Sequence, residues 1–284
     1  YAYAGSFYAY AIWIGLGVLA LVEALKKLLP DTVNAAVVTL VTLVLVPGIM
    51  FAENYDDHDR SNRYTARDLG ANYLKTCAEQ AVIFTNGDND TFPLWYNQEV
   101  EGVRTDVRVC NLSYLQTDWY ITQMKKQAYT SKPLPFSLKE EQYTQGTRDI
   151  IYLLDNPRIK REAIELTEAV NFVNSDDPAT KLVQADNAAY MPKKKLTFKV
   201  DKEAVIRNKV VRPQDYDKIV DTMYIDLSDR DFLGKDEYMI LDMIAHNNWE
   251  RPIYFAITIP PSKFLNLQDY FQMDYRKFIA KYFK

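Results

Sequence analysis

The sequence predicts an α/β protein in which two N-terminal transmembrane helices precede a Rossmann-like three-layer soluble domain with some antiparallel strands. Two observations support this prediction. The first 53 residues contain two long apolar runs. After them, short apolar runs alternate with amphipathic segments, which is typical of βαβ units with parallel strands. The length of 284 residues allows one or two domains and a sizeable core.

The two apolar runs cover about residues 7–25 and 33–52. Each is close to the roughly 20 apolar residues that a bilayer crossing needs, and soluble core helices are rarely so long and so uncharged. A cleaved signal peptide fits poorly, because the first run lacks a basic start and the second follows almost at once. We therefore predict two transmembrane helices within residues 1–53, with the lipid bilayer as a partner.

The charges between the two runs predict their orientation. Lys26 and Lys27 are the basic residues of the short connecting turn, so this turn should face the cytoplasm. Aromatic residues gather at both outer ends, as in an interfacial belt: Tyr1, Tyr3, Phe7, Tyr8, Tyr10 and Trp13 at one, and Phe51 and Tyr55 at the other. The domain predicted for residues 54–284 then lies outside the cytoplasm.

The soluble part is predicted element by element. A charged segment with helical periodicity covers residues 56–80 and precedes the first strand. A βαβα unit follows, with strands at 81–85 and 106–113 and helices at 91–102 and 117–129. The remaining predicted elements are a helix at 158–173, an antiparallel strand pair at 195–200 and 221–228, a helix at 235–249 and a buried strand at 251–259.

Composition excludes several classes of function. A net charge of −4 and a pI near 5.4 leave no basic field that would attract nucleic acid. Cys77 and Cys110 match no metal or redox spacing and are expected to be unpaired and packed. The two histidines are too few for a multi-histidine metal site, and no phosphate loop, dinucleotide fingerprint or catalytic triad pattern is present. We expect no cofactor in this chain, with a divalent cation as the weaker alternative.

Polar side chains follow the first two predicted strands. Ligands in open α/β sheets bind beyond the carboxyl ends of the strands, so these loops form the candidate site. Asp88, Asp90 and Asp118 could gather around a cation or sugar hydroxyls, with Trp95 or Trp119 as a stacking face. The candidate ligand-binding residues are Asn86, Asp88, Asn89, Asp90, Asn111, Asp118 and Trp119.

The same residues also fit an ordinary turn that leads into a capped helix. Asn86-Gly87 is a turn-forming pair, and Asp90 or Thr91 could cap the helix that follows. Pro93 suits a first helical turn, and Thr117 or Asp118 could cap the next helix. The spacing of an EF-hand calcium loop is absent. Both interpretations remain open from the sequence.

Four segments resemble a known family. They read "AYAGSFYAYAIWIGLG", "FTNGDNDTFPLWYNQEVEGVRTDVRVCNLSYLQTDWYI", "ILDMIAHNNWERPIYFA" and "LNLQDYFQ", and they extend to about Gln272. They are similar to large membrane proteins of Gram-negative bacteria, the protein O-mannosyltransferase-like family, a domain of unknown function with glycosyltransferase-C architecture. The second segment is long and the most specific of the four.

This resemblance implies a membrane half that uses a lipid-linked sugar and a C-terminal domain in the periplasm, at the bacterial inner membrane. The catalytic carboxylate of such enzymes lies in the first external loop, where it can draw a proton from an acceptor hydroxyl. This chain lacks that loop, begins at Tyr1 and departs from the family pattern after Gln272. We expect the C-terminal portion of such a protein, so catalytic residues are unassigned and enzymatic activity is an open question.

Three hypotheses follow. In the first, the chain is the membrane-anchored part of a glycosyltransferase-like protein, and it supports acceptor or glycan binding next to the rest of the membrane domain. In the second, it is a membrane-anchored periplasmic module that binds carbohydrate or protein and has no transferase role. In the third, it is a scaffold whose polar loops are only turns and helix caps.

Overall fold

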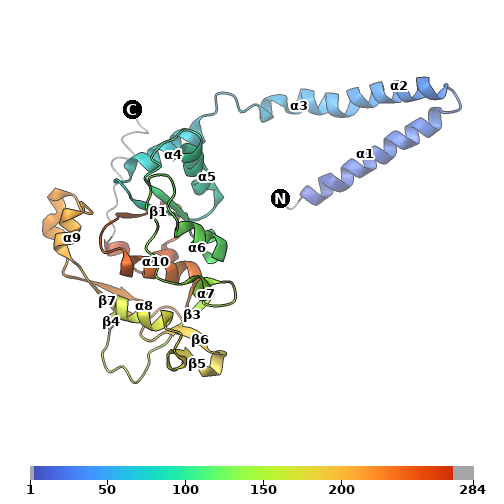
Figure 1. Cartoon of the computed structure of the whole chain (residues 1–284). Coiled ribbons are helices and arrows are strands. Elements are labelled where there is room, and N and C mark those ends of the chain that lie inside the picture. Colours follow the sequence, from blue (N-terminus) through green and yellow to red (C-terminus); the bar gives the residue numbers. More distant parts are fainter. Residues whose placement is uncertain (1–2, 271–284) are drawn as a thin grey trace. The chain divides into compact units, whose positions relative to one another are not determined.

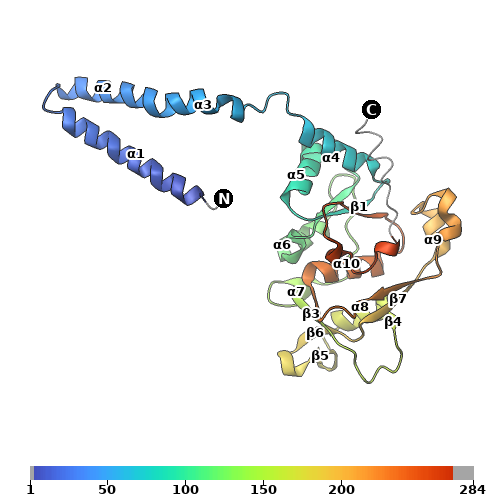
Figure 2. The same cartoon turned by 180° about the vertical axis from the view of Figure 1, so that it is seen from behind.

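The computed structural model describes residues 3–270, so the end of the predicted external domain, residues 271–284, lies outside the described residues. The chain falls into two compact units that are divided between Arg63 and Tyr64. The first unit is helical and the second is a mixed α/β domain (Figures 1 and 2).

The first unit is a hairpin of two long helices. Helix α1 spans Ala4–Leu25, and a continuous helix spans Asp31–His58. The hairpin is held in part by a hydrogen bond of 2.8 Å from Asn34 Nδ2 to the carbonyl oxygen of Val22. The second helix comprises α2 (Asp31–Leu43), a π-helical turn η1 (Val44–Gly48) that contains Pro47, and α3 (Ile49–His58).

Both helices of this hairpin are long and apolar enough to cross a membrane, and almost none of their residues are buried. They are therefore not core helices of this chain, and their exposed apolar surface is compatible with association with a lipid bilayer. The helices predicted at 7–25 and 33–52 are present. Each helix is longer than the apolar run from which it was predicted. The crossing itself and its orientation remain predictions.

The second unit is built around a small parallel sheet with the strand order β10-β1-β2. Strand β1 lies in the centre and pairs in parallel with both neighbours, with Val82 opposite both Ile253 and Arg108. Helix α5 connects β1 to β2, which confirms the predicted βαβ unit. The bounds are α4 (Thr65–Thr76), β1 (Val82–Thr85), α5 (Asp88–Glu99), β2 (Arg108–Asn111) and β10 (Ile253–Phe255).

The other described strands form two further small sheets. The four-stranded sheet has the order β5-β6-β3-β9, and the three-stranded sheet has the order β4-β7-β8. Strands β7 and β8 are antiparallel, as predicted for residues 195–200 and 221–228. The bounds are β3 (Ile150–Leu153), β4 (Ile164–Glu165), β5 (Lys181–Leu182), β6 (Ala188–Met191), β7 (Lys195–Lys199), β8 (Thr222–Asp226) and β9 (Phe232–Gly234). Because the strands are divided among three sheets, the finer Rossmann-like description is not confirmed.

Short helices complete the second unit. The α-helices are α6 (Asp118–Met124), α7 (Glu140–Tyr143), α8 (Leu166–Asn174), α9 (Lys202–Arg207) and α10 (Lys235–His246). The 3₁₀ turns are η2 (Tyr114–Gln116), η3 (Pro178–Thr180), η4 (Val183–Ala185), η5 (Pro213–Lys218), η6 (Pro261–Phe264) and η7 (Gln268–Tyr270).

The helices predicted at 91–102 and 235–249 are present as α5 and α10 with different ends, and three other predicted helices differ more from the structure. The segment predicted as a helix at 158–173 contains strand β4 and becomes helical only at Leu166. The reason is tertiary, because the backbone at Ile164 pairs with Leu196 of β7. The segment at 56–80 is helical only at its start and in α4, and the helix predicted at 117–129 ends at Met124.

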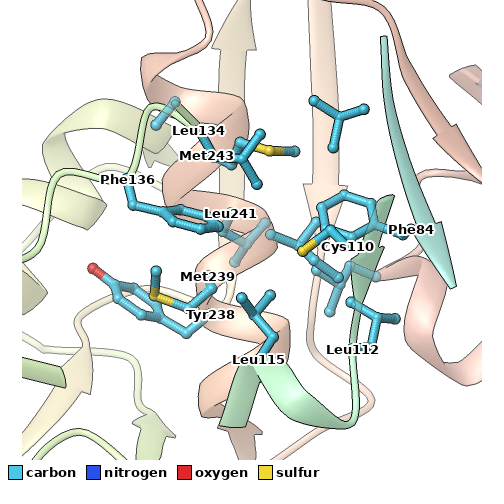
Figure 3. Packing of buried hydrophobic residues seen from close by; sticks show 14 of the residues in the cluster. Phe84, Cys110, Leu112, Leu115, Leu134, Phe136, Tyr238, Met239, Leu241 and Met243 are labelled. Atoms are coloured by element: carbon cyan, nitrogen blue, oxygen red, sulfur yellow. The ribbon is translucent and has the colours of Figure 1, made fainter. Parts of the chain in front are cut away.

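The core of the second unit gathers around α10. In Figures 1 and 2 this helix lies between the parallel sheet and the layer that contains α8 and β3. Figure 3 shows Tyr238, Met239 and Leu241 of α10 among buried side chains from β1, β2 and η2. Tyr238 is fully buried, and its hydroxyl contacts Asn174 of α8, so the helix is tied to both layers.

The two cysteines belong to this core. Cys77 and Cys110 are both free and buried, which confirms the predicted unpaired, packed state. Burial raises the pKa of each thiol to about 12, so neither is ionised at neutral pH. These thiols therefore act as small apolar side chains.

Candidate functional site

The turn after β1 begins the candidate site. Gly87 has a φ angle of +120°, a conformation that favours glycine, and α5 starts directly after it at Asp88. The helix therefore begins three residues before the predicted start at Thr91. As a result, Pro93 lies inside the helix and not in its first turn, so that prediction was wrong. Asp88 and Asp90 lie in the first turn, where the helix dipole favours negative charge.

Asp90 is a buried residue that holds this turn together. Its carboxylate accepts a hydrogen bond of 3.1 Å from the backbone N–H of Asn86 and another from the hydroxyl of Thr258. The N-cap residue itself is Gly87, which has no side chain, so the predicted cap by Asp90 or Thr91 does not form in the usual way. Asp90 instead joins the β1–α5 turn to the segment that follows β10.

Asn111, at the end of β2, is also buried and fixed. Its Nδ2 donates to the carbonyl oxygen of Gly87 at 3.2 Å and to Thr91 Oγ1 at 2.8 Å. Its Oδ1 accepts from the backbone N–H of Tyr114 at 3.2 Å. Asp90 and Asn111 therefore shape the sheet edge through hydrogen bonds within the chain.

Replacing Asp90 with alanine should lower the free energy of unfolding by about 1–2 kcal/mol, because the Asn86 N–H and the Thr258 hydroxyl lose their acceptor. Chemical denaturation of the full chain measures this change. The matched control is Asp88→Ala, since Asp88 is exposed and neighbours the same turn. If both variants lose equal stability, the buried contacts of Asp90 do not stabilise the turn.

A row of aromatic rings runs across the surface beside this edge. Phe92 and Trp95 of α5 lie 5.7 Å apart, between ring centroids. Trp95 and Tyr114 are 6.2 Å apart with ring planes only 12° from parallel, and Tyr114 is 6.0 Å from Trp119 of α6. Phe92 is 48% exposed and Trp119 is 55% exposed. We call these four residues the aromatic row.

Polar candidate residues lie along this row. Tyr114 donates its hydroxyl proton to Asp88 Oδ1 at 3.2 Å. Desolvation, together with the charge of Asp88, raises the pKa of Tyr114, so the hydroxyl is protonated at neutral pH. Asp88 and Asn89 are exposed, and Asn86 is partly exposed.

Asp118 lies at the other end of the row. Its Oδ1 accepts from the backbone N–H of Trp119 at 2.7 Å. Thr117 is the N-cap of α6 but makes no side-chain cap bond, so neither residue forms the predicted cap on the second or third N–H of the helix. An open depression of about 360 Å³ borders this end and is lined by Asp118, Trp119, Thr122, Gln123, Glu140 and Thr144.

The predicted set thus divides into two groups. Asp90 and Asn111 are buried, whereas the other five are exposed or partly exposed: Asn86, Asp88, Asn89, Asp118 and Trp119. Within residues 3–270, no group of three or more His, Cys, Asp or Glu side chains lies close enough together to hold a metal ion.

The sequence reasoning named Trp95 and Trp119 but missed Phe92 and Tyr114. The spacing of three residues between Phe92 and Trp95 on one helix could have revealed the first of these. No spacing pattern points to Tyr114, because it lies in the short 3₁₀ turn η2 between β2 and α6.

Comparison with known proteins gives one finding for this chain. The family model described as TMEM260-associated domain 2 matches residues 66–277, which is most of the second unit. No curated protein and no solved structure matches the chain.

Proposed function

The chain belongs to the family of TMEM260-associated domain 2, and on this premise we propose that it is the membrane-anchored C-terminal part of a glycosyltransferase-C-like, protein O-mannosyltransferase-like protein. In this proposal the second unit binds a glycan or a protein acceptor and does not itself catalyse transfer. It works beside the rest of the membrane domain, on the periplasmic side of a bacterial inner membrane. Nucleic acid is not a partner.

The aromatic row is the observation that carries the proposal. Sugar rings have apolar faces, so aromatic side chains with exposed faces suit them, and Trp and Tyr add polar groups at the ring edge. Asp88 and Asp118 contact residues of the row and supply carboxylate oxygens that can accept from sugar hydroxyls, and the exposed Asn89 adds an amide on the same helix as Phe92 and Trp95. The row is also close to the carboxyl ends of β1 and β2, the usual place for ligands in such sheets.

The first unit supports the membrane part of the proposal. Its two helices expose a mainly apolar surface, as a bilayer anchor does. The short turn between them carries Lys26 and Lys27, which favours a cytoplasmic turn and an external second unit.

Trp119→Ala should weaken glycan binding by roughly tenfold or more, since exposed tryptophans at binding surfaces are common hot spots. The measurement is binding of the full chain, in detergent, to a glycan array, followed by calorimetric titration of the best ligand. Asp88→Ala should also weaken binding without unfolding the protein, because Asp88 is exposed.

Phe232→Ala is the matched control. Phe232 is 54% exposed, close to the value for Trp119, but it lies on β9 away from the aromatic row. The Phe232→Ala variant should bind glycan with the same affinity as the unmodified chain. Equal losses of affinity in the Phe232 and Trp119 variants, or no glycan binding at all by the folded chain, would contradict the proposed role of the aromatic row.

A transfer assay separates the proposal from the alternative of a binding module without a transferase role. The second unit would be deleted from the full-length glycosyltransferase-like protein, and sugar transfer would be measured. Reduced transfer or altered acceptor choice supports a transferase-linked role. Unchanged transfer with retained glycan binding by this chain favours the independent module.

A further inference from the structure

A buried arginine without a counterion lies next to the aromatic row. Arg108 is the first residue of β2 and is only 4% exposed. Its Nη2 donates to the carbonyl oxygens of Gln123 and Lys126, at 2.7 Å each. Its Nε and Nη1 are buried and have no hydrogen-bond partner among residues 3–270. Buried unsatisfied donors are rare in proteins, and each needs an explanation.

The charge of Arg108 is also uncompensated. In the described part of the chain, no carboxylate forms an ion pair with it, and burial lowers the pKa of its guanidinium. The nearby Asp106 is already engaged by Arg104, through bonds of 2.7 and 2.9 Å. Arg251 is a second buried arginine close by, and burial, followed by the charge of Arg108, lowers the pKa of its guanidinium to about 10. A buried charge without a partner is costly, so this region favours an anion.

A pocket of about 190 Å³ lies at this position. Its buried lining includes Arg108, Gln98 and Ser131, and its exposed lining includes Gln127 and Tyr129. The hydroxyl of Ser131 accepts a hydrogen bond of 3.0 Å from Arg251, which lies behind the pocket lining. The carboxylate of Glu99 also lies in the lining, where it accepts from the hydroxyl of Tyr129.

We propose that this pocket binds an oxyanion of the phosphate class, with Arg108 as its main ligand. Arginine is the side chain best suited to phosphate, and its unused Nε and Nη1 donors would gain acceptors. Both donors are buried in the chain without ligand, so the anion reaches them only when side chains of the pocket lining move. Trp95 lines this pocket and also belongs to the aromatic row, so a phosphorylated sugar fits both surfaces.

Calorimetric titration of the full chain in detergent with inorganic phosphate, at constant ionic strength, tests the proposal. Saturable binding is expected, with at least a tenfold loss in Arg108→Gln. Arg158→Gln is the matched control, since Arg158 is exposed and lies outside the pocket lining. The same affinity in Arg108→Gln, or no saturable binding by the folded chain, overturns the proposal.

Gln123→Glu keeps the test decisive if the Arg108 variant does not fold. Gln123 is exposed, lines the pocket, and bonds to Arg108 only through its backbone carbonyl. A carboxylate there should weaken phosphate binding several-fold by repulsion, and unchanged affinity counts against the site.

Glucose 6-phosphate and glucose distinguish the possible sources of the anion. Tighter binding of the sugar phosphate than of inorganic phosphate assigns the pocket to a phosphorylated sugar, and equal binding assigns it to the free anion. The inference stands apart from the proposed glycan role: Trp119→Ala should leave binding of inorganic phosphate unchanged, because Trp119 does not line this pocket.

Discussion

Replacing Gly70 with alanine is expected to lower the free energy of unfolding of the second unit by about 2 kcal/mol, through overpacking. Gly70 is where α4 packs against α5. A methyl group there would lie 2.6 Å from Asn97 Nδ2, and the carbonyl oxygen of Pro93 would be closer still. No real side chain tolerates such distances, so the two helices must separate.

Separation also costs a hydrogen bond between the helices. Asn97 of α5 is buried, and its Nδ2 donates to the carbonyl oxygen of Arg67 of α4 at 2.8 Å. Alanine favours the helix over glycine by up to about 1 kcal/mol, which partly offsets the expected loss in the free energy of unfolding. The steric effect should dominate, because the obstructing atom of Pro93 is backbone and cannot rotate away.

Thermal unfolding of the full chain measures this effect. A loss of about 2 kcal/mol corresponds to a fall in Tm of roughly 4–8 °C for a domain of this size. Gly17→Ala is the control, since Gly17 is also helical but nothing lies within 4 Å of an added methyl group. A Tm that is unchanged in both variants would show that α4 and α5 are not tightly packed.

The second large effect is expected at Asp242 of α10, which is fully buried. Its carboxylate accepts from the backbone N–H of Ser137 at 2.8 Å and from the Ser137 hydroxyl, and it lies 3.2 Å from His246 Nδ1. Asp242→Ala removes these contacts together. The expected loss in the free energy of unfolding is about 2–4 kcal/mol, measured by chemical denaturation.

The same carboxylate makes stability depend on pH. The hydrogen bond from His246 to Asp242 raises the pKa of His246 above its ordinary value of 6.5. The folded state therefore binds the imidazole proton more tightly than the unfolded state does. This stabilisation is fully present below pH of about 6.5 and is lost as the pH rises through the higher folded pKa. Asp242→Asn should remove this part of the pH dependence.

His58 provides the control for this experiment. It is the second histidine of the chain, it is exposed, and it lies in α3 of the first unit. His58→Gln is the matched substitution, because it removes an imidazole and leaves the contact between His246 and Asp242 in place. A flat stability curve between about pH 6 and 8 in the unmodified chain would contradict the role given to His246.

The parallel βα unit could be predicted from the sequence because its signals are local. The apolar run that ends at Thr85, the Asn86-Gly87 turn and the second apolar run together indicate strand, turn, helix and strand. The start of α5 was misplaced because Asp88, Asn89 and Asp90 are typical loop residues. In the folded chain, they occupy the first helical turn, where the negative charges of Asp88 and Asp90 are favourable.

Other features depend on contacts between distant residues, and no local pattern reveals them. Ile164 lies in a segment with helical periodicity, yet it becomes a strand through pairing with Leu196. The buried Asp90 accepts a hydrogen bond from Thr258, which is distant in the sequence. The unpartnered donors of Arg108 can likewise be recognised only in the folded chain. The sequence could indicate which polar residues lie at the carboxyl ends of β1 and β2, but not which of them stay exposed.

The place of β1 in its sheet has a consequence for how the protein is made. This central strand pairs with β10, which lies about 170 residues later in the chain and is therefore synthesised well after it. Until β10 emerges, one edge of β1 has no partner, and such an edge can pair with other chains. The domain therefore completes its sheet late, and chains that stop before Ile253 should aggregate during expression.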